Sequence, residues 1–279
     1  MMTTQSLLHN LGAADISDRP FAHIATTQVL APDRYDALQA GFPSPEKIAG
    51  GSVPAMENAA LRLSSKAVLG DATITPDWRA FFDYHTSASF WSDIVKVFGD
   101  RLRAAHPGLE QRVGKPLQDF TVGRRGEKSP ADIRLECQFV INTPLQHASS
   151  VKTPHVDKRE TLFAGLFYMR SADDATPGGD LDLYEWKRAP RFLRYRMILP
   201  RDVAPVGSIP YVANSFAGFV NSPAAVHGVS PRLPTGHVRR YVNLVAEVPF
   251  HLFRTPLISL PAAISSWKDL RQIGWRKYG

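Results

Sequence analysis

The chain has 279 residues, of which 44% are hydrophobic and 21% charged, a balance that excludes disordered and fibrous proteins and indicates a folded globular protein. The single cysteine, Cys137, excludes an internal disulfide and is typical of a reducing compartment. The formal net charge of +7 is compatible with a nucleic-acid partner or with anionic ligands. Because the basic residues are mostly scattered along the chain, we expect no nucleic-acid partner. An anionic substrate would account for part of the positive charge.

The first 20 residues lack the basic start and the apolar core of a secretory signal. No apolar run in the sequence is long enough for a membrane span. The sequence also carries no internal repeat, low-complexity tract or flexible linker. We therefore expect a cytoplasmic enzyme that forms a single domain over residues 1–279.

The N-terminal part is predicted to contain one strand and several helices. Residues 20–30 are rich in β-branched side chains and partly alternate, which predicts a strand. A helix is expected to begin at Pro32, and the turn-rich residues 44–60 predict a surface loop. Thr75 is expected to cap a second long helix, and residues 89–105 predict a third with an aromatic face.

The rest of the chain consists of short apolar runs separated by turns that contain Pro and Gly. This pattern indicates a sandwich or barrel rather than a doubly wound α/β sheet. The expected strands cover residues 133–142, 162–169, 180–184, 197–199, 211–213, 216–220 and 241–248. The basic residues 186–196 predict a loop over the barrel mouth, and residues 251–279 predict an amphipathic C-terminal helix.

An imidazole and a carboxylate lie two positions apart at His155 and Asp157. On an extended backbone these side chains point to the same face, so both can reach one metal ion. A second histidine, His227, follows far downstream. Two histidines and one carboxylate form the facial triad that holds non-haem Fe(II). Taken alone, His155 and Asp157 would equally fit solvated polar residues at the exposed end of a strand.

Five phrases in this region, PHVD, LFAGLFYM, PGGDLDLY, FVNSPAAVHGV and RRYVNLV, resemble the 2-oxoglutarate and Fe(II)-dependent oxygenases, and most closely their prolyl-4-hydroxylase-like branch. The resemblance covers about residues 135–248. It implies that His155, Asp157 and His227 bind iron and that Arg240, followed by an aromatic residue, binds the far carboxylate of 2-oxoglutarate.

The neighbouring Arg239 is the alternative anchor for 2-oxoglutarate. Adjacent side chains on a strand point to opposite faces, so only one of the two arginines can enter the barrel. The arginine-tyrosine order typical of the family favours Arg240. Tyr168 is expected to face 2-oxoglutarate or, alternatively, to belong to the core. Lys158, Arg159 and Asn221 are candidate substrate contacts, with surface solvation and loop bracing as the alternatives.

The resemblance implies a mainly β fold with supporting helices, in which a double-stranded β-helix (jelly-roll, cupin-like) core packs on N-terminal helices. Residues 1–132 would supply the supporting helices, residues 133–250 the core and residues 251–279 a helical tail. The implied cofactors are Fe(II), 2-oxoglutarate and O2. The implied activity is hydroxylation of an unactivated C–H bond in a small molecule such as an amino acid, natural-product intermediate or sugar, with release of succinate and CO2. Hydroxylation of a protein side chain and non-catalytic binding of a metal or sugar are the alternatives.

Overall fold

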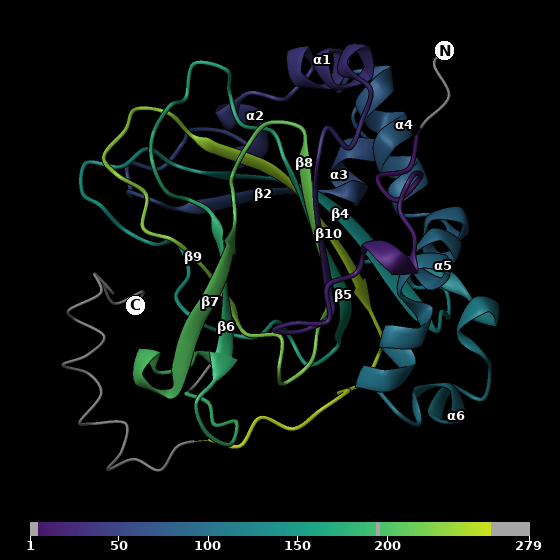
Figure 1. Cartoon of the computed structure of the whole chain (residues 1–279). Coiled ribbons are helices and arrows are strands. Elements are labelled where there is room, and N and C mark those ends of the chain that lie inside the picture. The colour runs from purple at the N-terminus through teal and green to yellow at the C-terminus, as the bar shows by residue number, and fades with distance from the viewer. Residues whose placement is uncertain (1–4, 194–195, 258–279) are drawn as a thin grey trace.

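The computed structural model describes residues 5–193 and 196–257, which form two β-sheets and a group of helices (Figure 1). The strands are β1 (His23–Thr27), β2 (Ala60–Ser64), β3 (Val122–Arg124), β4 (Ile133–Asn142), β5 (Thr161–Tyr168), β6 (Leu181–Trp186), β7 (Val203–Ile209), β8 (Ser215–Val220), β9 (His227–Val229) and β10 (Arg239–Glu247). The helices are α1 (Pro32–Ala40), α2 (Pro45–Ala49), α3 (Ser65–Leu69), α4 (Pro76–His85), α5 (Ala88–Ala105) and α6 (Leu109–Val113).

The large sheet has the strand order β1-β8-β5-β10-β4-β2, with β3 added in parallel beside β4. The other neighbours in this sheet are antiparallel. Strands β1 and β2 come from the N-terminal part of the chain, yet they form the two ends of the strand order. The predicted supporting region of residues 1–132 therefore contributes strands to the same sheet as residues 133–250.

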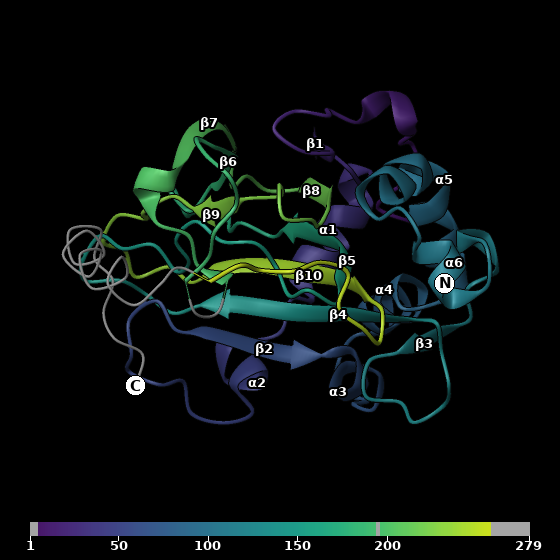
Figure 2. The same ribbon diagram turned by 90° about the horizontal axis from the view of Figure 1, so that it is seen from below.

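Helices cover one face of the large sheet, on the side away from β6 and β7 (Figures 1 and 2). Side chains from α4 and α5 and from β4, β5, β8 and β10 share one apolar core there. Trp78 is fully buried, its ring centre lies 4.6 Å from that of Phe139, and its indole N–H donates to the Leu38 carbonyl at 2.8 Å. Burial of several such aromatic rings, each contributing a few kcal/mol, fixes the helices on the sheet.

The second sheet has the order β7-β6-β9 and faces the large sheet. Leu181, Leu183 and Ile209 from the small sheet pack with Ala217 and Phe219 from the large one. The alternation of β-strand side chains therefore divides the large sheet into a face against the helices and a face toward the small sheet. The candidate site lies between the two sheets.

The predicted class of a mainly β protein with helices is confirmed. The strand at residues 20–30, the helices begun by Pro32 and Thr75, and the helix at 89–105 agree with β1, α1, α4 and α5. Thr75 caps α4 as predicted, because its hydroxyl accepts a hydrogen bond from the Trp78 amide at 3.5 Å. The predicted helix at 251–279 falls mostly outside the described residues.

Three predictions about these segments are wrong. The expected strand at 197–199 does not form, because Met197 makes only an isolated bridge to His155. The expected loop at 44–60 contains the short helix α2, which Ser44 caps and which ends at Gly50 in the left-handed conformation. The expected strand at 211–213 does not form, because the Tyr211 amide donates to the Asp180 carboxylate at 2.7 Å instead of to a neighbouring strand. The small sheet instead uses β7, which was not predicted because Pro205 and Gly207 argue against a strand. Both residues are tolerated because β7 is an edge strand.

No helix within residues 5–193 and 196–257 combines the length and the apolar character that crossing a membrane requires.

Candidate metal centre

The two histidines of the predicted triad are held side by side by the backbone. The His155 amide donates to the His227 carbonyl at 2.9 Å, and the His227 amide donates back to the His155 carbonyl at 3.0 Å. Their ring centres are 4.3 Å apart. This reciprocal pair joins two segments that are distant in sequence, so the small sheet itself sets the spacing of the imidazoles.

Asp157 completes the group. Its Oδ1 atom lies 3.8 Å from His155 Nε2 and 3.9 Å from His227 Nε2. One donor atom from each residue lies within 4.8 Å of the others, a spacing at which the three could hold a metal ion. The structure thus brings together the three residues that the sequence predicted as metal ligands.

The histidines are oriented to present their Nε2 atoms to a metal. Nδ1 of His155 lies 2.8 Å from the Thr153 carbonyl, and Nδ1 of His227 lies 2.9 Å from the Ala225 carbonyl. A carbonyl can only accept, so each Nδ1 carries the proton and each Nε2 keeps its lone pair. This is the tautomer that metal-ligating histidines require.

The protonation states of the three triad side chains also favour binding of a metal cation. Burial, followed by the charges of Lys152 and His227, lowers the pKa of His155 well below its ordinary value. Burial also lowers the pKa of His227. Burial by itself would raise the pKa of Asp157, but the charges of His227, Lys152 and Arg196 outweigh it, so this pKa is lowered. Near neutral pH the site therefore offers two neutral imidazoles and one carboxylate, the forms that bind metals.

Asn221 positions Asp157 and does not face the pocket, which corrects its assignment as a substrate contact. It is fully buried, its Oδ1 accepts from the Asp157 amide at 3.2 Å, and its Nδ2 donates to the carbonyls of Lys158 and Thr161, each at 2.9 Å. With both of its side-chain polar atoms paired to the backbone, Asn221 holds the loop that follows the metal-binding segment.

The prediction that Arg240 enters the barrel is wrong, because the structure places Arg239 there. Arg240 lies on the helix-facing side of β10, where its Nε donates to the Met169 carbonyl at 3.0 Å and its guanidinium lies 5.1 Å from the Phe42 ring. Arg239 lines the same cavity as the triad and is only 3% exposed. The arginine-tyrosine order favoured the residue on the wrong face of the strand.

Arg239 lies in a buried cage with unpaired polar atoms. Its guanidinium carbon is 4.7–5.2 Å from the ring centres of Tyr168, Tyr211 and Tyr241, and its Nε donates to the Gly179 carbonyl at 2.9 Å. Among the described residues, its Nη2 has no hydrogen-bond partner, and neither have the Tyr168 hydroxyl and the side-chain amide of Asn142. Asn142 pairs with Arg239 across β4 and β10.

These unpaired donors fit a carboxylate. Leaving buried polar atoms without partners costs about 1–3 kcal/mol each, so an anionic ligand that pairs with them gains that stabilisation. Burial raises the pKa of Tyr168 to about 12, so its hydroxyl keeps its proton and can donate. Gly179 has φ +87°, and a Cβ there would lie 3.2 Å from Arg239 Nε, so glycine leaves room for the guanidinium.

A cavity of about 530 Å³ connects the triad with Arg239. The large sheet contributes apolar and amide side chains such as Leu166, Phe219 and Asn243 to its wall. Lys158 lines it as predicted, whereas Arg159 does not: its Nη2 lies 3.1 Å from His251 Nε2 outside the cavity. The described charged side chains in the lining are Arg62, Arg125, Lys152, Asp157, Lys158, Arg196, Arg239 and Glu247. Sequence reasoning missed the contributions of residues 62, 125 and 152, which no local motif marks. Arg196 ends the basic segment 186–196 that was predicted to lie over the barrel mouth, and it does line the cavity.

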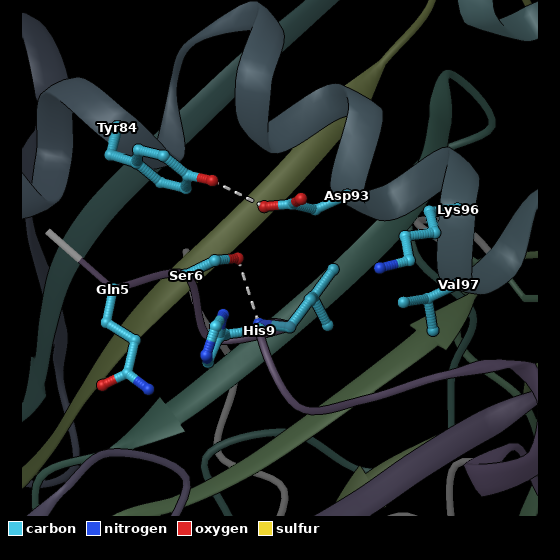
Figure 3. Close-up of a pocket in the computed structure, with 8 residues that line it drawn as sticks. Gln5, Ser6, His9, Tyr84, Asp93, Lys96 and Val97 are labelled. Carbon is cyan, nitrogen blue, oxygen red and sulfur yellow. Dashed lines mark hydrogen bonds between the residues drawn. The ribbon is translucent and has the colours of Figure 1, made fainter.

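A second hollow, of about 380 Å³, lies elsewhere, between the N-terminal segment and helices α4 and α5 (Figure 3). Tyr84 and Asp93 in its wall hydrogen-bond to each other at 2.8 Å, and Lys96 lies nearby. None of the triad residues lines it. The chemistry of the predicted metal site is therefore confined to the cavity between the sheets.

No protein-family model and no curated protein matches the sequence. Among solved structures, a Pseudomonas putida prolyl-4-hydroxylase is similar, with TM-score 0.44 and 14% identity over 82% of this chain and 93% of that one. A prolyl 4-hydroxylase from Phytophthora capsici has TM-score 0.47 and 13% identity over 90% of this chain and 67% of that one. The epimerase SnoN, solved with Fe3+ and alpha ketoglutarate, has TM-score 0.45 and 12% identity over 85% of this chain and 91% of that one. At these identities and TM-scores the likeness assigns no function to this chain.

Proposed function

We propose that this protein is an Fe(II)- and 2-oxoglutarate-dependent dioxygenase that hydroxylates an unactivated C–H bond of a small molecule. The observation that carries the proposal is that a triad of two histidines and one aspartate shares one cavity with a buried arginine that has an unpaired nitrogen. The chemistry supplied by bound Fe(II) and 2-oxoglutarate is O2 activation, in which substrate R–H becomes R–OH and 2-oxoglutarate becomes succinate and CO2. The family resemblance adds that the two sheets form a double-stranded β-helix core within one catalytic domain.

The residues of the chain bind and orient in this reaction. His155, Asp157 and His227 would hold the Fe(II) through two imidazole nitrogens and one carboxylate oxygen. Arg239 takes the far carboxylate of 2-oxoglutarate, with the Tyr168 hydroxyl as a second donor. A buried guanidinium fixes the orientation of a carboxylate through parallel N–H groups, so the keto acid end is directed toward the triad.

The cavity supports a small-molecule substrate over a protein side chain. Its volume of about 530 Å³ falls within the range of small-ligand sites, roughly 300–1,000 Å³, and must hold 2-oxoglutarate and the substrate together. A non-catalytic metal-binding protein would have no use for a carboxylate-binding arginine beside the metal. Hydroxylation of a peptide remains the outcome to look for if small substrates fail.

The test is succinate formation by anaerobically purified protein given Fe(II), 2-oxoglutarate, air and a substrate panel that includes peptides. We expect turnover that His155→Ala and Arg239→Gln abolish and that Arg240→Gln, the matched change on the opposite face, retains. Direct binding of 2-oxoglutarate to the Fe(II)-loaded protein without O2 is measured in parallel. Failure of the wild-type protein to bind either Fe(II) or 2-oxoglutarate would refute the proposal.

A further inference from the structure

The cavity between the sheets carries more positive charge than the proposed metal and 2-oxoglutarate require. Its described lining has six cationic side chains and two carboxylates. Glu247 is already paired, since its Oε1 lies 2.7 Å from Arg125 Nη2. Asp157 is the proposed metal ligand, and Arg239 is the proposed partner of 2-oxoglutarate. Once Asp157 is assigned to the metal, the remaining cations, including Lys152 at 3.7 Å from Asp157 Oδ1, lack a further counter-ion within the lining that the structure describes.

Three of these cations, Arg62, Lys152 and Arg196, line the same cavity as the triad. They come from β2, from the loop before His155 and from the loop after β6, respectively. Like charges held together in this way destabilise the site unless an anion lies among them.

The hydrogen bonding of these groups leaves them available. Arg62 is exposed to the cavity and has no hydrogen-bond or ion-pair partner among the described residues. The Nε atom of Arg196 is buried and also has no hydrogen-bond partner among the residues that the structure describes. Lys152 Nζ reaches only as far as Asp157 Oδ1, at 3.7 Å, longer than a hydrogen bond.

We propose that Arg62, Lys152 and Arg196 form an anion subsite that binds a carboxylate or phosphate group of the primary substrate. The inference rests on the proposed function, because it assigns Arg239 to 2-oxoglutarate and Asp157 to the metal. An anchored anionic group would place the rest of a small substrate over the open face of the metal. The hydroxylated carbon then belongs to a small acid or a phosphate ester and not to a neutral sugar or hydrocarbon.

The test uses the full chain loaded with Mn(II) and 2-oxoglutarate without O2, and three probes that share an aromatic body: benzoate, phenyl phosphate and benzyl alcohol. Binding is measured by titration calorimetry at two salt concentrations. We expect both anions, or one of them, to bind at least tenfold more tightly than benzyl alcohol, with an affinity that falls as salt rises. The stronger of the two anions identifies the substrate group as carboxylate or phosphate.

Arg62→Gln should weaken anion binding about tenfold, and Arg62→Lys should restore much of it. Lys128→Gln is the matched control, because Lys128 is an exposed cation outside the cavity lining. Equal binding of benzyl alcohol and the anions, no effect of Arg62→Gln, or an equal effect of Lys128→Gln would each overturn the subsite.

These failures are distinguishable from failure of the proposed function. If only the anion subsite is wrong, Mn(II) and 2-oxoglutarate still bind, and Arg239→Gln still weakens 2-oxoglutarate binding by roughly 150-fold. If the proposed function is wrong, 2-oxoglutarate fails to bind, while the Arg62-dependent preference for anionic probes remains measurable in the metal-free protein.

Discussion

Replacing Arg239 by glutamine should weaken 2-oxoglutarate binding far more than the same replacement at Arg240. Arg239 is 3% exposed and has an unpaired Nη2 inside the cavity. Arg240, its neighbour, is occupied by the Met169 carbonyl and the Phe42 ring on the other side of the strand. The pair therefore compares two identical substitutions that differ only in the face of β10.

The magnitude follows from removing one partner of a buried charge pair, which costs about 2–5 kcal/mol. A loss of about 3 kcal/mol at Arg239 corresponds to a roughly 150-fold weaker 2-oxoglutarate affinity. Arg240→Gln removes a hydrogen bond to a carbonyl outside the cavity, so it should lower the free energy of unfolding by about 1 kcal/mol and change the affinity less than about threefold.

The assay is anaerobic titration of 2-oxoglutarate into Fe(II)-loaded protein, with denaturant unfolding of each variant as the control for stability. A larger loss of 2-oxoglutarate affinity in Arg240→Gln than in Arg239→Gln would refute the assignment of the anchor. It would mean that the face of β10 deduced from its hydrogen bonds and packing does not govern co-substrate binding.

Two other changes test the surroundings of the site, and a third tests a buried histidine in the helix core. Asn221→Ala removes the hydrogen bonds that hold the Asp157 loop, so metal affinity in a competing-chelator titration should fall roughly 10- to 100-fold. An unchanged metal affinity would show that the loop holds Asp157 in place without Asn221. Gly179→Ala adds a Cβ 3.2 Å from Arg239 Nε at a backbone φ of +87°. The affinity for 2-oxoglutarate should therefore drop about tenfold while the metal affinity stays at the wild-type value. Loss of both affinities would instead indicate general misfolding. Burial lowers the pKa of His85 from 6.5 to about 3, so the unfolded chain binds a proton that the folded protein excludes. The stability that this group contributes is full above pH 6.5 and is lost as pH falls toward 3, by up to about 5 kcal/mol. Denaturant unfolding from pH 7 to pH 4 should show a shallower pH dependence for His85→Gln, and parallel curves would contradict the role of His85.

The elements that the sequence predicts correctly are those with local causes. Thr75 followed by Pro76 begins α4, and the alternating residues of β4 were predicted at the bounds that the structure has, Ile133–Asn142. The pair His155 and Asp157 was recognisable because its two-residue spacing is itself the geometry of a strand. His227 was recognised through the family phrase around it, and the small sheet accounts for its position beside His155.

Features that depend on the packing of distant segments could not be predicted from the sequence alone. Strand alternation establishes that Arg239 and Arg240 point to opposite faces, but which face meets the helices is decided by the packing of the core. The role of Asn221 depends on its contact with a loop 64 residues away, and no spacing rule covers such a pair. The gathering of Arg62, Lys152 and Arg196 likewise depends on the pairing of β2 with β4 and on the two loops at the cavity.

The sequence by itself therefore determined the kind of chemistry, because the identity and spacing of metal-ligating side chains are properties of the chain. The tertiary structure decided which arginine enters the cavity of the candidate metal site and which charged side chains line that cavity. The physical reason is that a side chain's direction follows from local backbone geometry, whereas its neighbours follow from how whole sheets and helices bury their apolar faces.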